Sequence, residues 1–318
     1  GDILPFYRRL LRVLPGLVLF FALVMPARGR DAGPVHPVVV FQVETEAGQK
    51  AAEKCHATWR DEGPGLVSRI LGSGPAPTRP DTVTCLVLNT DSFQRHFTGR
   101  LPDWGVGVAV PGGRVIALDH TRVNRVGRGL REVFLHEMVH ALLFQGTEGA
   151  SLPAWFHEGT AMLLSGEWKF SDTVSLILDG QVPDLSRLQG RFPVPHDRAD
   201  RAYRASLLAV SRLEENFGET IIADLVAQTR VTGDFPTAFA DVTGQELGTF
   251  QQDFASAMSL KYGWVLFMTR WPGLFVLAAM VLALGAIRKI AVNRRRLAEM
   301  DDEDHPQATW PPDQGSSA

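Results

Sequence analysis

The first third of the chain combines short apolar runs with a longer helical pattern, which predicts a small sheet with a helix beside it. Residues 38–43 and 82–88 are apolar runs of strand length. Residues 47–71, between them, have the spacing of apolar positions expected of a helix. This order of elements indicates a mixed α+β fold that starts near residue 36.

Two further apolar segments flank a turn signal. Residues 105–110 and 115–118 lie on either side of Pro111-Gly112-Gly113, a combination that predicts a β-hairpin. The edge strand of such a hairpin could bind an extended peptide as one more strand. A hairpin with a purely structural role is the competing interpretation.

The middle of the chain predicts a buried helix. Residues 130–144 contain no Gly or Pro and place apolar residues around the whole circumference of the helix. A helix that is apolar on every side is normally buried. Gly146 and Gly149 follow this stretch, and we expect them to end the helix.

The rest of the region up to residue 260 is predicted to be mostly helical. A second helix is expected at residues 154–164, beginning beside Pro153 with Ser151 as its candidate cap. Residues 182–200 are rich in Pro, Arg and Asp and are predicted to form a loop. Four further helices, separated by Gly-containing breaks, are predicted at residues 202–217, 220–229, 235–242 and 247–258.

A long apolar stretch near the end of the chain predicts a transmembrane helix. Residues 271–287 are apolar throughout, and with residues 264–269 they approach the roughly 20 residues needed to span a bilayer. Arg270 interrupts the run at a position suited to an interfacial anchor. Basic residues follow immediately, at Arg288, Lys289, Arg294, Arg295 and Arg296. Positive charge marks the cytoplasmic side, so residues 36–260 are expected outside the membrane. A buried core helix is the alternative.

The two ends of the chain also carry localisation signals. Arg8, Arg9 and Arg12 precede an apolar stretch at residues 13–24, which indicates a secretory signal within residues 1–30. We expect this signal to be cleaved rather than kept as an anchor. Residues 288–318 are expected in the cytoplasm, and the acidic, Pro-rich tail from Asp301 is expected to be disordered.

Charge and cysteine content narrow the class of protein further. The formal net charge of −3 gives no sign of a nucleic-acid-binding surface. The chain has two cysteines, Cys55 and Cys85. Outside the cytoplasm they could form a disulfide between the first helix and the second strand, or they could remain free.

The candidate chemistry lies in the buried middle helix, at His136-Glu137-Met138-Val139-His140. Residues four apart on a helix share one face, so His136 and His140 can bind the same metal ion. A catalytic zinc needs a third protein ligand and an open position. Glu158, on the next predicted helix, is the candidate ligand, and Glu137 is placed to act as general base toward the attacking water.

Two alternatives accompany this interpretation. His157 is a rival third ligand, but it points about 100° away from Glu158 around the helix, so one of the two can face the metal. We favour Glu158. The simpler alternative for His136 and His140 is a histidine pair without a metal.

The segment Trp155-Phe156-His157-Glu158-Gly159, together with the His-Glu-x-x-His helix, resembles the gluzincin metallopeptidases and in particular the bacterial peptidase MA-like domains. The resemblance covers roughly residues 36–258 and is most specific at residues 134–161. It implies a zinc peptidase with His136, His140 and Glu158 as ligands. Leu143 and Gly146 occupy positions where a metzincin has glycine and histidine, and no aminopeptidase segment precedes the helix, so an endopeptidase is favoured.

The resemblance also suggests a residue that could stabilise the oxyanion of the reaction. Tyr203 is similar to the tyrosine or histidine that many gluzincins carry beyond the third ligand, and a phenol donor there would strengthen its hydrogen bond in the transition state. A role for Tyr203 in anchoring its helix in the core is the other interpretation. His196 is a weaker candidate for the same position.

These observations predict a single-pass membrane protein whose zinc metallopeptidase domain faces outward and cleaves peptide or protein substrates. Zinc, one ion, is the expected cofactor, and the lipid bilayer is an expected partner. The competing hypothesis is a catalytically silent, membrane-tethered binding or scaffold protein built on the same fold, and intact Glu137 argues against it. A zinc hydrolase that cuts another bond, such as an amide of the cell wall, is a third possibility.

Overall fold

The computed structural model describes residues 37–72, 82–97, 105–123, 129–167, 184–190, 196–269 and 271–303. Side chains are described for these residues except 196–197, 259–269, 271–274 and 297–303. The predicted signal at residues 1–30 lies outside this part of the chain. Contacts divide the chain into two compact units, Gly1–Lys261 and Tyr262–Ala318, which we describe separately.

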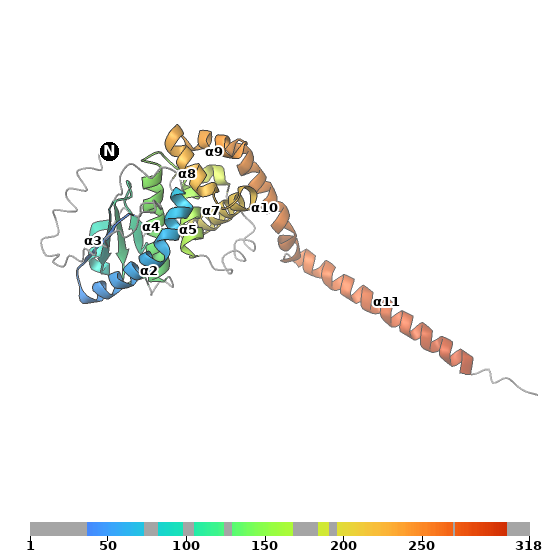
Figure 1. The fold of residues 1–318 in the computed structure, drawn as a ribbon. Helices are drawn as coiled ribbons and strands as arrows, with labels where there is room; N and C mark the ends of the chain where they lie inside the picture. The colour runs from blue at the N-terminus through green and yellow to red at the C-terminus, as the bar shows by residue number, and fades with distance from the viewer. Residues whose placement is uncertain are drawn as a thin grey trace, which may run out of the picture. The chain divides into compact units, whose positions relative to one another are not determined.

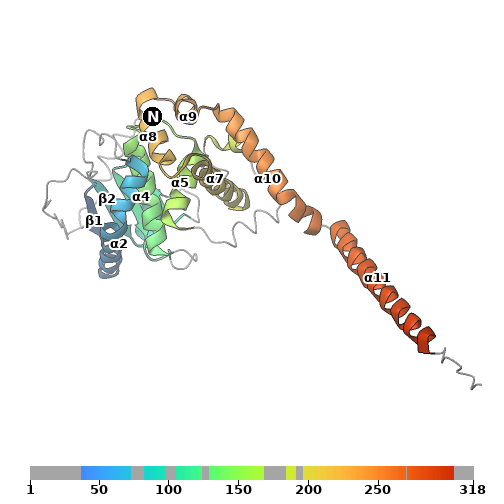
Figure 2. The same ribbon diagram turned by 45° about the vertical axis from the view of Figure 1, so that its right-hand side comes forward.

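The first unit contains a four-stranded sheet in the order β1-β2-β4-β3. Strands β1 (Val39–Val43), β2 (Val83–Leu88) and β4 (Val115–Asp119) are parallel, with Val39 opposite Val83 and Thr84 opposite Val115. The edge strand β3 (Gly107–Ala109) runs antiparallel to β4 and completes the predicted hairpin. Figure 2 shows this sheet at one side of the unit, next to the helices. The mixed α+β fold class is therefore confirmed.

Two helices connect these strands. Helix α2 (Glu46–Leu71) matches the prediction, and the Thr45 side chain caps it by accepting a hydrogen bond from Gly48 N at 3.0 Å. Helix α3 (Thr90–Phe97) was not predicted, because it is short and mostly polar. Phe93 and Phe97, one turn apart on α3, pack into the sheet core.

The two helices expected to carry the chemistry are present, with different boundaries. Helix α4 (Leu130–Gly146) includes Gly146, and Thr147 ends it by donating its hydroxyl to Leu143 O at 3.0 Å. Helix α5 (Ala154–Ser165) starts directly after Pro153, without a side-chain cap, so the prediction of Ser151 as the cap is wrong. Figure 1 shows α4 in the interior of the unit, with α2 and α5 beside it.

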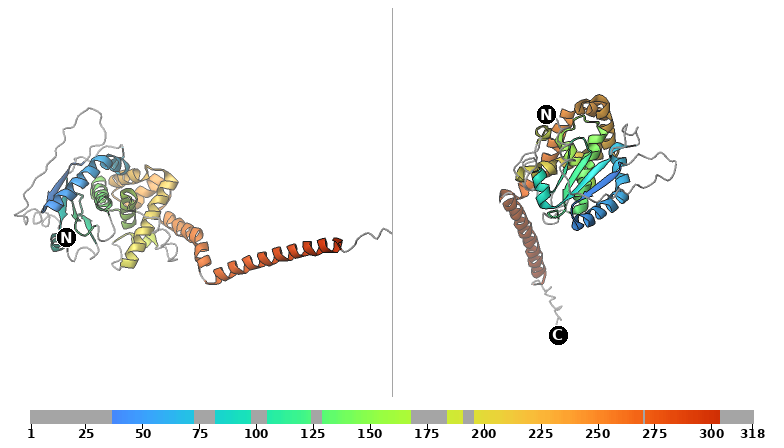
Figure 3. Two further views of the ribbon diagram at one scale, coloured as in Figure 1. Left: turned by 90° about the horizontal axis from the view of Figure 1, so that it is seen from below. Right: turned by 90° about the vertical axis from the view of Figure 1, so that its left-hand side faces the viewer.

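The remaining helices of the first unit pack on α5, on α4 and α2, and on one another (Figure 3). The predicted loop at 182–200 contains a short 3-10 helix, η1 (Leu185–Leu188), and the start of the following helix, so that part of the prediction is wrong. Ring stacking between Trp155 and Phe250 ties α5 to the last helix of the unit. The helices are α7 (His196–Phe217), α8 (Ile221–Thr232), α9 (Phe235–Thr243) and α10 (Leu247–Thr269).

The second unit contains α11 (Trp271–Glu303), a helix long and apolar enough to cross a membrane. Its candidate span is Phe275–Arg296, and none of that span is buried against protein. Residues 264–269 of the predicted span lie in α10, and residues 275–287 of it lie in the candidate span of α11. Helix α11 also continues to Glu303, where a disordered tail was expected from Asp301. Arg270 lies outside the described residues.

Cys55 on α2 and Cys85 on β2 are both buried and free, so the structure does not contain the disulfide that the sequence left open. Burial raises the pKa of Cys55 to about 12, and burial followed by the neighbouring Cys55 raises that of Cys85 well above its usual value. Both groups are therefore protonated thiols packed in an apolar core, which is the unreactive state of cysteine.

Candidate metal centre

Helix α4 holds three ionisable side chains inside an apolar environment. His136, Glu137 and His140 are 9%, 7% and 8% exposed, and most other residues of the helix are buried. Buried ionisable groups are costly unless they are paired with each other or with a metal ion. Their position therefore calls for a specific set of partners.

The first of these partners is Glu158 on α5. The Nε2 atoms of His136 and His140 face each other at 3.0 Å, and Oε2 of Glu158 lies 3.4 Å from each of them. These three residues form a group that could hold a metal ion. The sequence prediction of Glu158 as the companion of the two histidines agrees with this arrangement.

The triangle formed by these three atoms has the size of one face of a tetrahedral metal site. Bonds of about 2.0–2.1 Å from a tetrahedral zinc place neighbouring ligand atoms about 3.3–3.4 Å apart. Glu158 Oε2 is also buried and makes no aligned hydrogen bond with a described residue, although both imidazoles are near. A cation between the three atoms would satisfy all of them at once.

The electrostatics of the group also favour a cation. Burial lowers the pKa of His136, but Glu167, Glu158 and Glu137 outweigh it and raise the pKa to about 10. Burial raises the pKa of Glu158, but His140 and His136 outweigh it and hold the pKa well below its usual value. The acidic neighbours thus stabilise a positive charge on His136, and the two histidines stabilise the negative charge of Glu158.

Close helix packing places Glu158 in the site. An ideal Cβ added to Gly159 would lie 2.2 Å from the Ser206 carbonyl oxygen of α7, so α5 and α7 approach more closely there than a side chain allows. The start of α5 is fixed by a hydrogen bond from Ala154 N to Gln189 O, at the end of η1. Glu158, between these two fixed points, is directed toward α4.

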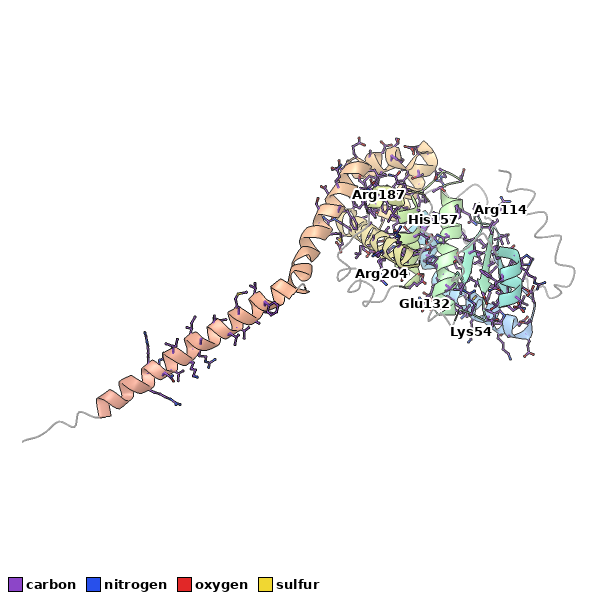
Figure 4. The ribbon with its side chains drawn as sticks, turned by 180° about the vertical axis from the view of Figure 1, so that it is seen from behind. Lys54, Arg114, Glu132, His157, Arg187 and Arg204 are labelled. Atoms are coloured by element: carbon purple, nitrogen blue, oxygen red, sulfur yellow. The ribbon has the colours of Figure 1, made fainter. Side chains whose placement is uncertain are left out.

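His157 has a different place from the one considered in the sequence. Its ring stacks on that of His140 at a centroid distance of 4.6 Å, and the Nδ1 atoms of the two rings are 2.6 Å apart. His157 therefore contacts the side of His140 opposite to the ligand triangle. Burial, followed by the charge of His140, lowers the pKa of His157 to about 3, so it is a neutral hydrogen-bond partner. Figure 4 shows His157 among the helices, with Lys54 and Arg187 further out.

Glu137 lies between the site and the edge of the sheet. An ideal Cβ on Gly107 of β3 would be 2.5 Å from Glu137 Oε1, so the backbone of the edge strand passes directly beside this carboxylate. Burial raises the pKa of Glu137, His136 and His140 oppose the rise, and Glu158 and Glu167 add to it. A raised pKa makes the carboxylate a stronger base. No pattern in the sequence predicts that Gly107 lies beside Glu137.

Glu167 is a second residue that the sequence prediction missed. Its Oε2 atom lies 2.9 Å from His136 Nδ1, an ion-pair contact whose alignment is not that of a regular hydrogen bond. Glu167 follows the end of α5 and is nine positions beyond Glu158, so no helical spacing connects it to the site. Only the path of the chain after Gly166 brings it there.

The two residues predicted as candidates for stabilising the oxyanion are Tyr203 and His196, and both belong to α7. Tyr203 is half-buried on α7, three residues before Ser206, whose carbonyl faces Gly159. This position is one helical turn from the contact between α5 and α7. His196 is the first residue of α7, and its side chain lies outside the described part of the chain.

Comparisons with known proteins leave the identity of the chain open. No protein-family model matches the sequence. The chain is 26% identical over 132 residues to the Bacillus subtilis (strain 168) protein described as "Uncharacterized protein YhcO", a match that covers 39% of this chain. The chain spans 40% of the length of that relative.

Proposed function

We propose that this chain is a membrane-anchored, extracytoplasmic zinc metallopeptidase that hydrolyses peptide bonds. The observation that carries the proposal is the ligand triangle of His136, His140 and Glu158, with a fourth polar residue, Glu137, next to the first ligand on the same helix. Two histidines, one carboxylate and an adjacent glutamate are the composition of catalytic zinc sites in metallopeptidases. The gluzincin resemblance of the sequence points to the same chemistry.

The residues of the chain divide the reaction between them. When bound, zinc would act as a Lewis acid that polarises the substrate carbonyl and lowers the pKa of water. Glu137 would take a proton from the attacking water while the oxygen of that water bonds to the carbonyl carbon. Glu137 would then pass this proton to the leaving nitrogen as the C–N bond breaks. The edge strand β3 beside Glu137 is suited to hold an extended peptide by backbone pairing.

Tyr203 completes this proposal as the donor of a hydrogen bond to the oxyanion. Its place on α7, one turn from the contact with Gly159, supports this role. Replacement of Tyr203 by Phe should lower kcat by roughly 10²-fold or more and leave zinc content unchanged, because a single oxyanion donor contributes about this much. An unchanged kcat would leave Tyr203 as a core anchor.

The general test uses the full-length protein in detergent. Zinc content is measured by elemental analysis, and cleavage of a peptide library is compared between wild type, Glu137→Gln and the control Glu53→Gln, an exposed carboxylate on α2. We expect one zinc per chain in all three and a loss of about 10²- to 10⁴-fold in cleavage for Glu137→Gln only. A wild type without zinc would contradict the proposal. Zinc without any cleavage by wild type would favour the scaffold hypothesis.

The location of the domain is part of the proposal. The apolar span Phe275–Arg296 is exposed along its length, and Arg288, Lys289 and Arg294 to Arg296 cluster at its end. We expect a tag at the C-terminus to resist protease added outside intact cells or spheroplasts, while the domain before residue 261 is accessible. If the protease digests the C-terminal tag, the orientation of the chain in the membrane is the opposite of the one proposed.

A further inference from the structure

The two candidate ligand histidines have different groups at their other ring nitrogens. His140 Nδ1 meets the neutral ring of His157 at 2.6 Å, whereas His136 Nδ1 meets the carboxylate of Glu167 at 2.9 Å. We infer that Glu167 is a positioning residue, which fixes the ring of His136 so that its Nε2 atom faces the metal. This inference rests on the proposed zinc site and extends it to a residue outside the ligand motif.

Glu167 is on the wrong side of His136 to be a ligand itself. The Nδ1 and Nε2 atoms lie on opposite sides of the imidazole ring, and Nε2 is the atom that faces His140 and Glu158. A carboxylate at Nδ1 favours the proton on that nitrogen and leaves the lone pair on Nε2. Glu167 thus selects the tautomer that can bind the metal.

The local structure holds Glu167 in this place. The chain turns at Gly166, whose φ of 71° is in the left-handed region, and Glu167 N then donates to Ser165 Oγ at 3.3 Å. Arg131 of α4 donates to the Ser165 carbonyl at 3.3 Å and also pairs with Glu62 of α2. The end of α5 is therefore tied to α4, the helix that carries His136.

Burial strengthens the contact between Glu167 and His136. The side chains of Glu167 and His136 are both 11% exposed, so water competes little for either group. Outer partners of this kind typically change metal affinity by about 10- to 100-fold when they are removed. A carboxylate that only stabilised the fold would instead affect the metal-free protein.

The test measures zinc affinity of the full-length protein in detergent by competition with a chelator. Three variants are compared with wild type: Glu167→Gln, Glu167→Asp and the control Glu219→Gln, which removes a carboxylate that is 84% exposed. We expect Glu167→Gln to weaken zinc binding about 10- to 100-fold, Glu167→Asp to recover part of the loss, and Glu219→Gln to match wild type. The unfolding temperature of metal-free Glu167→Gln should stay close to that of metal-free wild type.

Each other outcome is decisive. If wild type binds zinc and Glu167→Gln binds it equally well, the positioning role is wrong while the proposed function stands. If Glu167→Gln lowers only the unfolding temperature of the metal-free protein, the role of Glu167 is structural and the inference is also wrong. A wild type that binds no zinc removes both the proposed function and the inference.

A measurement on wild type covers the case in which Glu167→Gln does not fold. Nitrogen-15 NMR of labelled histidines in the zinc-loaded, full-length protein reports which ring nitrogen binds the metal and which carries a proton. We expect His136 to bind through Nε2 and to carry its proton on Nδ1, with that proton shifted downfield by the carboxylate. Binding through Nδ1 would overturn the inference without any variant.

Discussion

Helices α4 and α11 are both rich in apolar residues, but they have opposite surroundings. Phe134 and Leu142 of α4 are completely buried by the sheet and the neighbouring helices, whereas Leu282 of α11 is 73% exposed. Apolar surface is unfavourable in water in either case. The comparison teaches that an apolar composition shows that a helix needs an apolar neighbour, but not whether this neighbour is protein or lipid. For α11 we propose lipid.

The difference also matters for chemistry. In α4, protein packing on all sides leaves the polar residues His136, Glu137 and His140 with one another and with Glu158 as partners, which shifts the pKa of several of these groups. The basic residues of α11, such as Arg288, are exposed. Ionisable groups on an apolar helix therefore become a candidate reactive site only where the protein itself encloses them.

The largest expected effect comes from adding a charge to each helix. Leu142→Arg places an unpaired charge in the core and should cost more than about 4 kcal/mol of folding free energy, a large part of the roughly 5–15 kcal/mol that stabilises a domain. Leu282→Arg should leave the folding of the first unit unchanged but weaken membrane insertion by about 3–4 kcal/mol. Thermal unfolding of the purified protein and retention in washed membranes measure the two effects. Equal unfolding temperatures for the two variants would contradict the proposed difference between a helix enclosed by protein and a helix enclosed by lipid.

A smaller effect is expected when one methyl group is added to a glycine of each helix. In Gly146→Ala of α4, the new Cβ would lie 2.6 Å from Val226 Cγ1 and 2.7 Å from Leu71 Cδ2, so we expect a loss of about 1–3 kcal/mol. In Gly285→Ala of α11, nothing lies within 4 Å of the new Cβ, and the change should be neutral or favourable because Ala stabilises helices. Denaturant unfolding of the full chain compares them. A destabilised Gly285→Ala would show that α11 has a protein neighbour.

The smallest effect is expected from a substitution beside Glu137, in the part of the site that α4 and β3 enclose. Gly107→Ala would place a Cβ 2.5 Å from Glu137 Oε1 and 2.9 Å from Val133 Cγ1. Both atoms are ends of side chains, so we expect the carboxylate to move while the fold stays intact. We expect cleavage of a peptide substrate to fall about tenfold, equivalent to roughly 1.4 kcal/mol, with zinc content unchanged. Gly190→Ala, where nothing lies within 4 Å of the new Cβ, is the matched control. Loss of zinc in Gly107→Ala would place Gly107 at the ligands instead.

Patterns of residues that are close in the sequence were sufficient to predict much of the fold and of the candidate ligand group. Apolar runs located the four strands, because strands that are buried on both faces, such as β2 and β4, are continuously apolar. Apolar periodicity located most helices, because burial on one face imposes a period of 3.6. It missed α3, a short polar helix held by Phe93 and Phe97, and the first turn of α7. The spacing of four residues placed His136 and His140 on one face of a helix for the same reason.

The sequence by itself determined which side chains of α4 can face a metal together and which stretches of the chain need an apolar neighbour, because both follow from local geometry and composition. The tertiary structure decided that Glu158 rather than His157 completes the ligand group, that Glu167 contacts His136, and that Gly107 lies beside Glu137. These relations join residues on separate elements. Their distances depend on how α4, α5 and β3 pack, and no spacing along the chain encodes that packing.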